Sequence, residues 1–207
     1  MRLILVRHGE TAWNKEGRFQ GQSLVGLNQR GAAQARRVAK ALLPTKPTAL
    51  YSSPLTRTLM TAQEISQELS IPVVPMEGIK EINLGELEGI TGQGMRTQYP
   101  QVYAAWREDP SDVVFPGGES LRQLQERAWS AIKGIEQTHP EDVVVAVSHN
   151  FAIRAILCRF LGLPLSRFHL LRIDLGSISV LQANSRLRQV LTLNDRCHLS
   201  QDELQEA

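Results

Sequence analysis

Cysteine is scarce in this sequence, because Cys158 and Cys197 are the only two among 207 residues. Two cysteines are too few for the disulfide framework of a small secreted domain, and they do not form a C-x-x-C pair of the redox type. Cys158 lies in an apolar helical pattern, so we expect it to be a core residue. A fold that depends on a framework of disulfide bonds is therefore excluded.

Long apolar runs and a charge bias are also missing. No run approaches the roughly 20 apolar residues of a membrane-spanning helix, and the first residues form a strand pattern where a signal peptide would lie. With 23 Lys and Arg against 21 Asp and Glu, the net charge of +2 does not indicate a positively charged surface for nucleic acid or an anionic membrane. We therefore expect a cytoplasmic protein without a nucleic-acid or membrane partner.

Several catalytic motifs are absent as well. The sequence has no G-x-S-x-G elbow of the serine hydrolases and no P-loop. Its five histidines show no spacing typical of a zinc site. The sequence thus predicts neither a metal nor an organic cofactor.

Strand and helix patterns do alternate along most of the chain, and 42% hydrophobic residues are enough for a sizeable core. The expected strands are 2–6, 49–52, 71–76, 143–148, 170–174, 177–183 and 188–193. Helices are expected to begin near Asn28, Ser53, Thr91, Gln101, Ser120 and Phe151. The alternation predicts an α/β fold, a three-layer αβα sandwich with a mostly parallel mixed sheet.

Residues 77–120 interrupt this alternation. The segment is rich in glycine and too long for a plain connection, and such insertions usually serve function. No linker divides the chain. We expect one domain over residues 1–207, with 77–120 inserted as a cap that sets specificity.

Charged side chains follow the carboxyl ends of the predicted strands. Arg7 and His8 follow the first strand, Arg57 lies in the first turn of the helix after the second, and His149 follows strand 143–148. Ligands bind at this edge of open α/β sheets. An arginine beside a helix N-terminus makes sense if an anion lies between them. The set suits a phosphoryl group.

Glu81 follows the third predicted strand and is the candidate proton carrier. A bound phosphate favours the acid form of a neighbouring carboxyl group through like-charge repulsion. In that form Glu81 would protonate a leaving alkoxide and later accept a proton from water. For His8 the residue type alone leaves base, nucleophile and metal ligand open.

Six motifs, in the correct order, resemble the histidine phosphatase (phosphoglycerate mutase-like) superfamily. They are LVRHGET at 5–11 with Asn14 and Gln20-Gly21, LNQRG at 27–31 with Gln34-Ala35, SSPLTR at 52–57 with Thr61-Ala62, Glu81 with Gly85 and Glu88-Gly89, PGGES at 116–120, and Ser148-His149. The likeness covers nearly the whole chain. It implies the phosphoglycerate mutase-like fold and the phosphatase branch, near metal-independent phosphoserine phosphatases and α-ribazole phosphatases.

The resemblance also implies a mechanism. His8 attacks phosphorus in line and forms a phosphohistidine, and Glu81 acts first as acid and then as base. Arg7, Arg57 and His149 hold the equatorial oxygens. The further phosphate-binding residues are Asn14, Gln20, Gly21 and Asn150. The protein's own cations take the place of a metal, and the substrate is a small phosphomonoester such as phosphoserine or a sugar or sugar-acid phosphate.

The sequence departs from the family pattern at several positions. Asn150 replaces the usual glycine, where its side chain can cap the following helix, and Leu24 and Gly26 stand where many relatives have aspartate. The tail Cys197-His198-Leu199 is similar to that of the phosphoserine phosphatases, whereas Leu84 stands where those relatives tend to have histidine. The candidate specificity residues are Leu84, Tyr103, Trp106 and His198.

Two other functions stay open. A cofactor-dependent phosphoglycerate mutase has a longer segment before the Gly-Gly loop, with adjacent arginines for a second phosphate, whereas this chain has the separated Arg96 and Arg107. A non-catalytic phospho-ligand-binding regulator would have lost His8 or Glu81, and both are present. The dimers of the family and the apolar late strands favour a homodimer.

Overall fold

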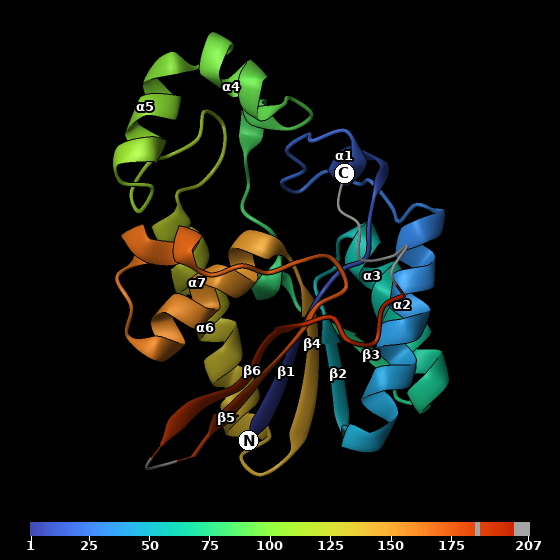
Figure 1. Cartoon of the computed structure of the whole chain (residues 1–207). Coiled ribbons are helices and arrows are strands. Elements are labelled where there is room, and N and C mark those ends of the chain that lie inside the picture. Colours follow the sequence, from blue (N-terminus) through green and yellow to red (C-terminus); the bar gives the residue numbers. More distant parts are fainter. Residues whose placement is uncertain (185–186, 201–207) are drawn as a thin grey trace.

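The computed structural model describes residues 1–184 and 187–200, and its centre is a six-stranded sheet with the order β3-β2-β4-β1-β5-β6 (Figure 1). The strands are β1 (Arg2–Arg7), β2 (Ala49–Ser52), β3 (Val73–Pro75), β4 (Val143–Ser148), β5 (Ile178–Ala183) and β6 (Arg188–Asp195). The first four of the spatial order are parallel. β5 pairs antiparallel with both β1 and β6. The predicted mostly parallel mixed sheet is confirmed.

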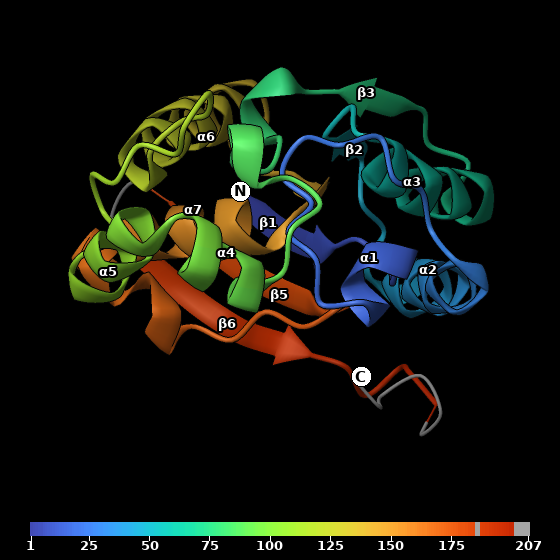
Figure 2. The same cartoon turned by 90° about the horizontal axis from the view of Figure 1, so that it is seen from above.

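Helices cover both faces of the sheet, as a three-layer sandwich requires (Figures 1 and 2). α2 (Gln29–Leu42) and α3 (Thr56–Leu69) lie on one face, and α6 (Leu121–Thr138) and α7 (Asn150–Leu161) lie on the other. The alternation of side chains along β1 explains the two layers. Leu3 and Leu5 enter the core beside α6 and α7, whereas Ile4 and Val6 enter the core beside α2 and α3.

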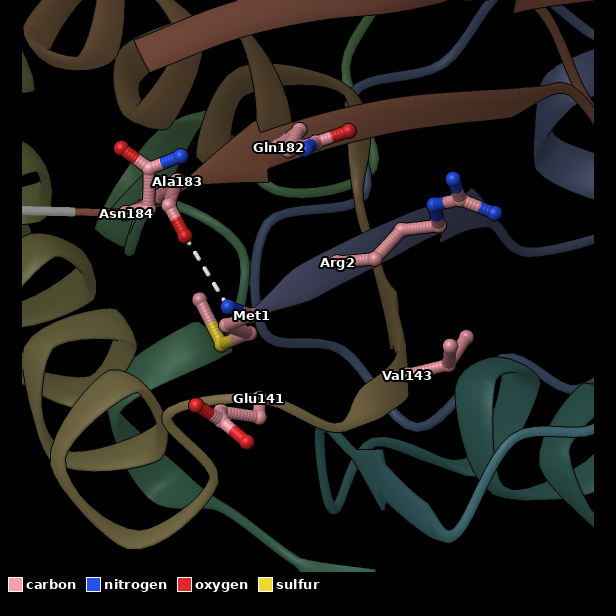
Figure 3. Close-up of a pocket in the computed structure, with 7 residues that line it drawn as sticks. All are labelled: Met1, Arg2, Glu141, Val143, Gln182, Ala183 and Asn184. Atoms are coloured by element: carbon pink, nitrogen blue, oxygen red, sulfur yellow. Dashed lines mark hydrogen bonds between the residues drawn. The ribbon is translucent and has the colours of Figure 1, made fainter. Parts of the chain in front are cut away.

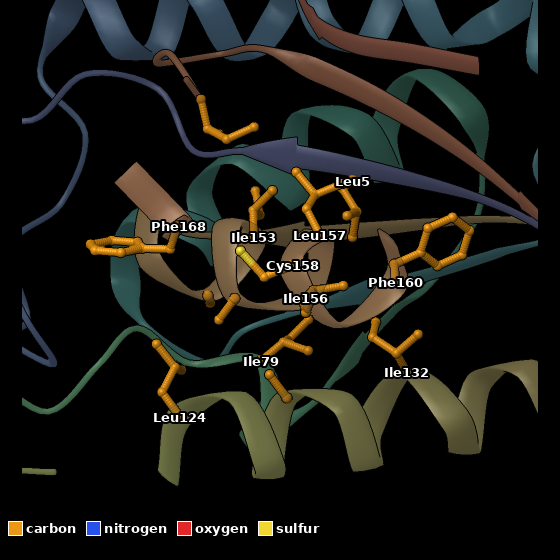
Figure 4. Packing of buried hydrophobic residues seen from close by; sticks show 14 of the residues in the cluster. Leu5, Ile79, Leu124, Ile132, Ile153, Ile156, Leu157, Cys158, Phe160 and Phe168 are labelled. Atoms are coloured by element: carbon orange, nitrogen blue, oxygen red, sulfur yellow. The ribbon is translucent and has the colours of Figure 1, made fainter. Parts of the chain in front are cut away.

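The larger core lies between the sheet, α6 and α7 (Figure 4). Leu5 of β1, Leu124 of α6 and Ile156 of α7 are buried there. Cys158 lies in the same cluster, as expected, and burial raises the pKa of its thiol to about 11. A thiol with so high a pKa carries almost no thiolate at neutral pH, so Cys158 is a packing residue.

Residues 77–120 form short helices above the carboxyl ends of the parallel strands (Figure 1). They are the 3-10 helices η2 (Glu77–Ile79) and η3 (Gly85–Leu87) and the α-helices α4 (Gly92–Gln98) and α5 (Pro100–Glu108). The two ends of this segment pack closely against each other around Gly85 and Gly118. A Cβ on Gly85 (φ +53°) would lie 2.1 Å from the Pro116 carbonyl oxygen, and one on Gly118 would lie 2.2 Å from that of Asn83.

Most helix starts follow the sequence signals. The side chains of Asn28 and Ser120 cap α2 and α6, and Thr91 caps α4. The start expected at Ser53 is wrong, because α3 begins at Thr56 and its N-cap is Leu55. Ser53 Oγ instead lies 2.8 Å from His149 Nε2. A short helix, α1 (Ala12–Lys15), was not expected.

The strand predicted at 170–174 is also wrong. Leu165–Leu170 form the 3-10 helix η4, and the residues after it pair with side chains instead of a neighbouring strand. The Ile173 carbonyl accepts from Arg7 Nη1, and the Asp174 N–H donates to Asn194 Oδ1. A strand prediction from apolar composition alone is therefore wrong for this segment, whose backbone binds the side chains of Arg7 and Asn194. In the described parts of the chain, no helix is long and apolar enough to span a membrane.

Candidate active site

Loops that follow three parallel strands meet at the carboxyl edge of the sheet. β1 and β4 are neighbours with Arg7 opposite Ser148, and this register places the rings of His8 and His149 with centroids 5.3 Å apart. Arg57 comes from the first turn of α3, directly after β2. A cavity of about 160 Å³ opens here, lined by Arg7, His8, Asn14, Arg18, Phe19, Gln20, Gly21, Arg57, Glu81, Leu84, Asn150 and Phe151.

His8 is held as a neutral imidazole with a defined tautomer. Its Nδ1 lies 2.7 Å from the Gly9 carbonyl oxygen, and because a carbonyl only accepts, Nδ1 carries the hydrogen. The lone pair is then on Nε2. Burial, followed by the charges of Arg57 and Arg7, lowers the pKa of His8 well below 6.5. His8 is thus an unprotonated nucleophile or base at neutral pH.

Arg57 is a buried cation, only 1% exposed. Its Nη2 donates to the Gly21 carbonyl at 2.6 Å and its Nη1 to the Ser23 carbonyl at 3.0 Å. Burial lowers the pKa of Arg57 to about 10, so the guanidinium stays charged at neutral pH. Gly21 has φ +50°, and a Cβ there would lie 2.2 Å from Glu88 Oε1, so the loop that holds Arg57 favours glycine at this position.

Arg7 is the second cation of the cavity. Its Nη1 donates to the Ile173 carbonyl at 2.7 Å, and its backbone N–H donates to the Ser177 carbonyl. The Gly176 N–H in the same loop donates to the His8 carbonyl. Residues 173–177, which begin inside the wrongly predicted strand 170–174 and extend beyond it, therefore hold the side chain of Arg7 and the backbone of Arg7 and His8.

His149 is fully buried beside His8. Its Nε2 lies 2.8 Å from Ser53 Oγ, and its buried Nδ1 has no hydrogen-bond partner among the described residues. Burial, then the charges of Arg57 and its neighbours, lowers the pKa of His149 well below 6.5. A neutral His149 with a hydrogen on Nδ1 has a donor to offer an oxyanion.

Glu81 is 7% exposed and lines the same cavity. Its Oε1 accepts from the N–H groups of Ile82 and Ala152, and its Oε2 accepts from that of Phe151. Phe151 and Ala152 lie in the first turn of α7. The N-terminus of α7 therefore binds the Glu81 carboxylate through these two groups.

Three side-chain amides complete the polar lining. Asn14 uses Oδ1 to accept from Thr11 in the capping box of α1, which leaves its NH₂ group for a ligand. Gln20 Oε1 and Asn150 Oδ1 are buried without a hydrogen-bond partner in the described part of the chain. Asn150 does not cap α7 as expected, because it is the first helical residue and the N-cap is His149.

The candidate specificity residues are separated by the structure. Leu84 is buried and lines the cavity, whereas Tyr103, Trp106 and His198 are not among the lining residues. Trp106 packs edge-on against Phe151, a residue of the cavity wall, with ring centroids 5.9 Å apart. His198 Nε2 lies 2.9 Å from the Gly176 carbonyl oxygen, behind His8.

Sequence reasoning missed three lining residues, Arg18, Phe19 and Phe151. The first two directly precede Gln20-Gly21, and Phe151 lies two residues after His149, so proximity to the motifs was the available signal. With Leu84, the two phenylalanines form an apolar wall beside the phosphate-binding groups.

A second hollow, of about 280 Å³, lies at the opposite end of β1 (Figure 3). Met1, Arg2, Glu141, Val143, Gln182, Ala183 and Asn184 line it. The Met1 amino group donates to the Ala183 carbonyl at 2.9 Å there. None of the predicted site residues lies in this hollow.

The cavity at the carboxyl edge combines an unprotonated histidine, the guanidinium groups of Arg7, Arg18 and Arg57, and a carboxylate. This set suits nucleophilic attack on a phosphoryl group, because the cations stabilise charge on the equatorial oxygens and the carboxyl group moves a proton. Among the described residues, no three His, Cys, Asp or Glu side chains are grouped to hold a metal ion.

Comparison with known proteins agrees with this geometry. The sequence model of the histidine phosphatase superfamily (branch 1) matches residues 3–196. Phosphoserine phosphatase 1 of Hydrogenobacter thermophilus is 37% identical over 201 residues, 97% of this chain and 95% of the relative. YhfR of Bacillus stearothermophilus superposes with a TM-score of 0.90 at 29% identity, over 95% of this chain and 98% of that one. A mutant phosphoserine phosphatase from Entamoeba histolytica, solved with phosphoserine, gives a TM-score of 0.83 at 27% identity, over 96% and 99% of the two chains.

Proposed function

The chain belongs to the histidine phosphatase superfamily (branch 1) and is a phosphoric monoester hydrolase, and we propose that it works without a metal through a phosphohistidine on His8. The proposal rests above all on the state of His8. Its Nδ1–H is bound to the Gly9 carbonyl and its pKa is lowered, so Nε2 is available to attack. Arg7 and Arg57 line the same cavity and supply the positive charge.

In the first step, the Nε2 lone pair of His8 forms the bond to phosphorus while the ester P–O bond breaks. Glu81 in its acid form gives its proton to the leaving oxygen. Arg7, Arg57 and His149 stabilise the charge on the equatorial oxygens, and Asn14, Gln20, Gly21 and Asn150 complete the phosphate site.

In the second step, water attacks phosphorus and the P–N bond breaks. The Glu81 carboxylate takes the proton of the water, which restores the acid, and the electron pair of the broken bond returns to Nε2. Inorganic phosphate leaves, and both residues are ready for the next turnover.

Phosphoserine is the first substrate to test, and sugar and sugar-acid phosphates are the alternatives. The similarity to phosphoserine phosphatases supports the first choice. Leu84 and its phenylalanine neighbours, which form an apolar wall, favour a less polar leaving group. We propose that residues 77–120 set this choice within one domain. The cytoplasmic location and the homodimer stay predictions.

The alternative functions have less support. A mutase needs groups for a second phosphate, yet Arg96 and Arg107 are exposed on α4 and α5 and neither lines the cavity. A binding-only regulator does not explain why His8 and Glu81 both line the same cavity.

Phosphate release in excess EDTA is the decisive assay. The panel comprises phosphoserine, phosphothreonine, 3-phosphoglycerate, α-ribazole phosphate and sugar phosphates, and His8→Ala is the control. We expect rapid release from one compound, trapped phosphohistidine in the wild type and neither in the variant. Loss of activity in EDTA, or full activity of His8→Ala, would overturn the proposal. Interconversion of 2- and 3-phosphoglycerate without release would favour the mutase.

A further inference from the structure

Arg127 of α6 lies outside the cavity, yet its guanidinium binds the loop that carries Glu81. Nη1 donates to the carbonyl oxygens of Gly78 and Lys80, both at 2.9 Å, and Nη2 donates to that of Glu81 at 2.8 Å. Three carbonyl groups within four residues thus accept from one side chain. A planar guanidinium is suited to this, because its donors have a fixed arrangement.

Glu119 holds Arg127 and extends the contact to the other side of Glu81. Arg127 Nε donates to Glu119 Oε2 at 3.0 Å, and Glu119 Oε1 accepts from the Asn83 N–H at 2.9 Å. The Glu119 N–H donates to the Asn83 carbonyl. The two side chains are 25% and 17% exposed. This ion pair therefore fixes the backbone before and after Glu81.

The loop has little freedom to shift while this pair is intact. A Cβ on Gly78 would lie 2.6 Å from that of Ala131, so η2 packs directly on α6, the helix of Arg127. The Glu81 carboxylate in turn binds the first turn of α7 through Phe151 and Ala152. An acid must lie within hydrogen-bond reach of the leaving oxygen, and a displacement of about 1 Å can cost 100-fold in rate.

We propose that Arg127, paired with Glu119, is a positioning residue for the proton transfer by Glu81. This inference rests on the proposed function, in which Glu81 is the acid. An alkoxide leaving group needs that proton, whereas p-nitrophenolate leaves readily as an anion. Because kcat/KM reports only the steps up to departure of the leaving group, disturbance of Glu81 lowers kcat/KM for phosphoserine much more than for p-nitrophenyl phosphate.

The experiment compares kcat/KM for these two compounds in wild type, Arg127→Gln, Arg127→Lys, Glu119→Gln and Glu81→Gln. Arg122→Gln is the matched control, because Arg122 lies on the same helix and, within residues 1–184 and 187–200, its side chain pairs with the exposed Asp112 and not with the loop. We expect the ratio of kcat/KM for p-nitrophenyl phosphate to kcat/KM for phosphoserine to rise about 10- to 100-fold in Arg127→Gln. It should rise less in Arg127→Lys and Glu119→Gln and stay unchanged in Arg122→Gln.

A double variant separates positioning from general damage. In the Glu81→Gln background, Arg127→Gln should not change the ratio further, because the proton donor is already gone. An equal loss on both compounds in Arg127→Gln would overturn the inference. If Arg127→Gln does not fold, the same comparison in Arg127→Lys and Glu119→Gln decides.

The failures of the two proposals are distinguishable. If Glu81→Gln leaves the ratio unchanged, Glu81 is not the acid and the proposed mechanism is wrong. If Glu81→Gln raises the ratio and the Arg127 and Glu119 variants do not, the mechanism stands and the positioning role is wrong.

Discussion

Replacement of Asp174 by asparagine tests the ion cluster behind Arg7. Asp174 is 6% exposed, and its carboxylate accepts from Arg172 Nε at 2.8 Å, Arg196 Nη1 at 2.8 Å and Asn194 Nδ2 at 3.0 Å. Burial alone would raise the pKa of Asp174. The hydrogen bonds from these three side chains outweigh it and lower the pKa from 3.8 to about 2.

The shift sets the size and the pH window of the effect. Each pKa unit corresponds to about 1.4 kcal/mol, so the ionised carboxylate stabilises the fold by about 2–3 kcal/mol. Asparagine has nearly the shape of the protonated acid and loses this amount. Because the pKa is lower in the folded state, the stabilisation is present above about pH 4 and is lost as the pH falls towards 2.

Urea unfolding of wild type and Asp174→Asn at pH 7 and near pH 2.5 measures the difference. We expect wild type to be more stable than Asp174→Asn by about 2–3 kcal/mol at pH 7 and by much less at the lower pH. Arg172→Gln and Arg196→Gln remove one partner each from the same carboxylate. The Arg172 side chain is 70% exposed and that of Arg196 is 13% exposed, so the first change should cost less than about 1 kcal/mol and the second more.

Two results would refute this reasoning. One is a difference between wild type and Asp174→Asn that does not depend on pH, and the other is equal destabilisation by the two arginine changes. Activity gives an independent measure, because the neighbouring Ile173 carbonyl accepts from Arg7. We expect weaker competitive inhibition by inorganic phosphate in Asp174→Asn than in Arg172→Gln.

Three further predictions concern the cavity itself. Burial and the nearby arginines lower the pKa of His8. In the pH profile of kcat/KM, the fall on the acid side should therefore have its midpoint below pH 6.5. A midpoint at or above that value would contradict a neutral nucleophile. Gly21→Ala adds a Cβ 2.2 Å from Glu88 Oε1 at φ +50°, and thermal unfolding should show a loss above about 1–2 kcal/mol with at least 10-fold lower activity. Gly17→Ala is its control, since φ is +66° there but no atom lies within 4 Å, so its activity should be retained. Arg57→Lys keeps the charge but loses the planar donors, and kcat/KM should fall by about 100- to 1,000-fold in steady-state assays; a change below tenfold would argue that charge alone suffices.

The fold was largely predictable because local patterns and tertiary structure agree. The strands at 49–52 and 143–148 have the predicted bounds, and Asn28 and Ser120 cap the expected helices. Parallel strands end at the same edge of a sheet, so the residues after them were expected to meet. The 5.3 Å between the rings of His8 and His149 confirms that this topological argument is sound.

The parts that could not be predicted depend on contacts between distant residues. The segment 170–174 is apolar enough for a strand, but Arg7 and Asn194 bind its backbone instead. Arg127 lies in an amphipathic helix, where an arginine ordinarily indicates a solvated face. Only the three-dimensional structure brings it to the carbonyl groups beside Glu81.

The hydrogen bonds of Arg57 explain how a rigidly held side chain still has N–H donors for a ligand. A guanidinium has five N–H donors, and the carbonyl groups of Gly21 and Ser23 accept from two of them. Those two bonds fix the plane of the group, while the buried Nε has no partner among the described residues. Burial disfavours the charge, which the lowered pKa of about 10 records. A phosphoryl group bound beside Arg57 removes this penalty and needs no reorganisation of the loop, so the same burial that destabilises the cation strengthens its hold on the developing negative charge.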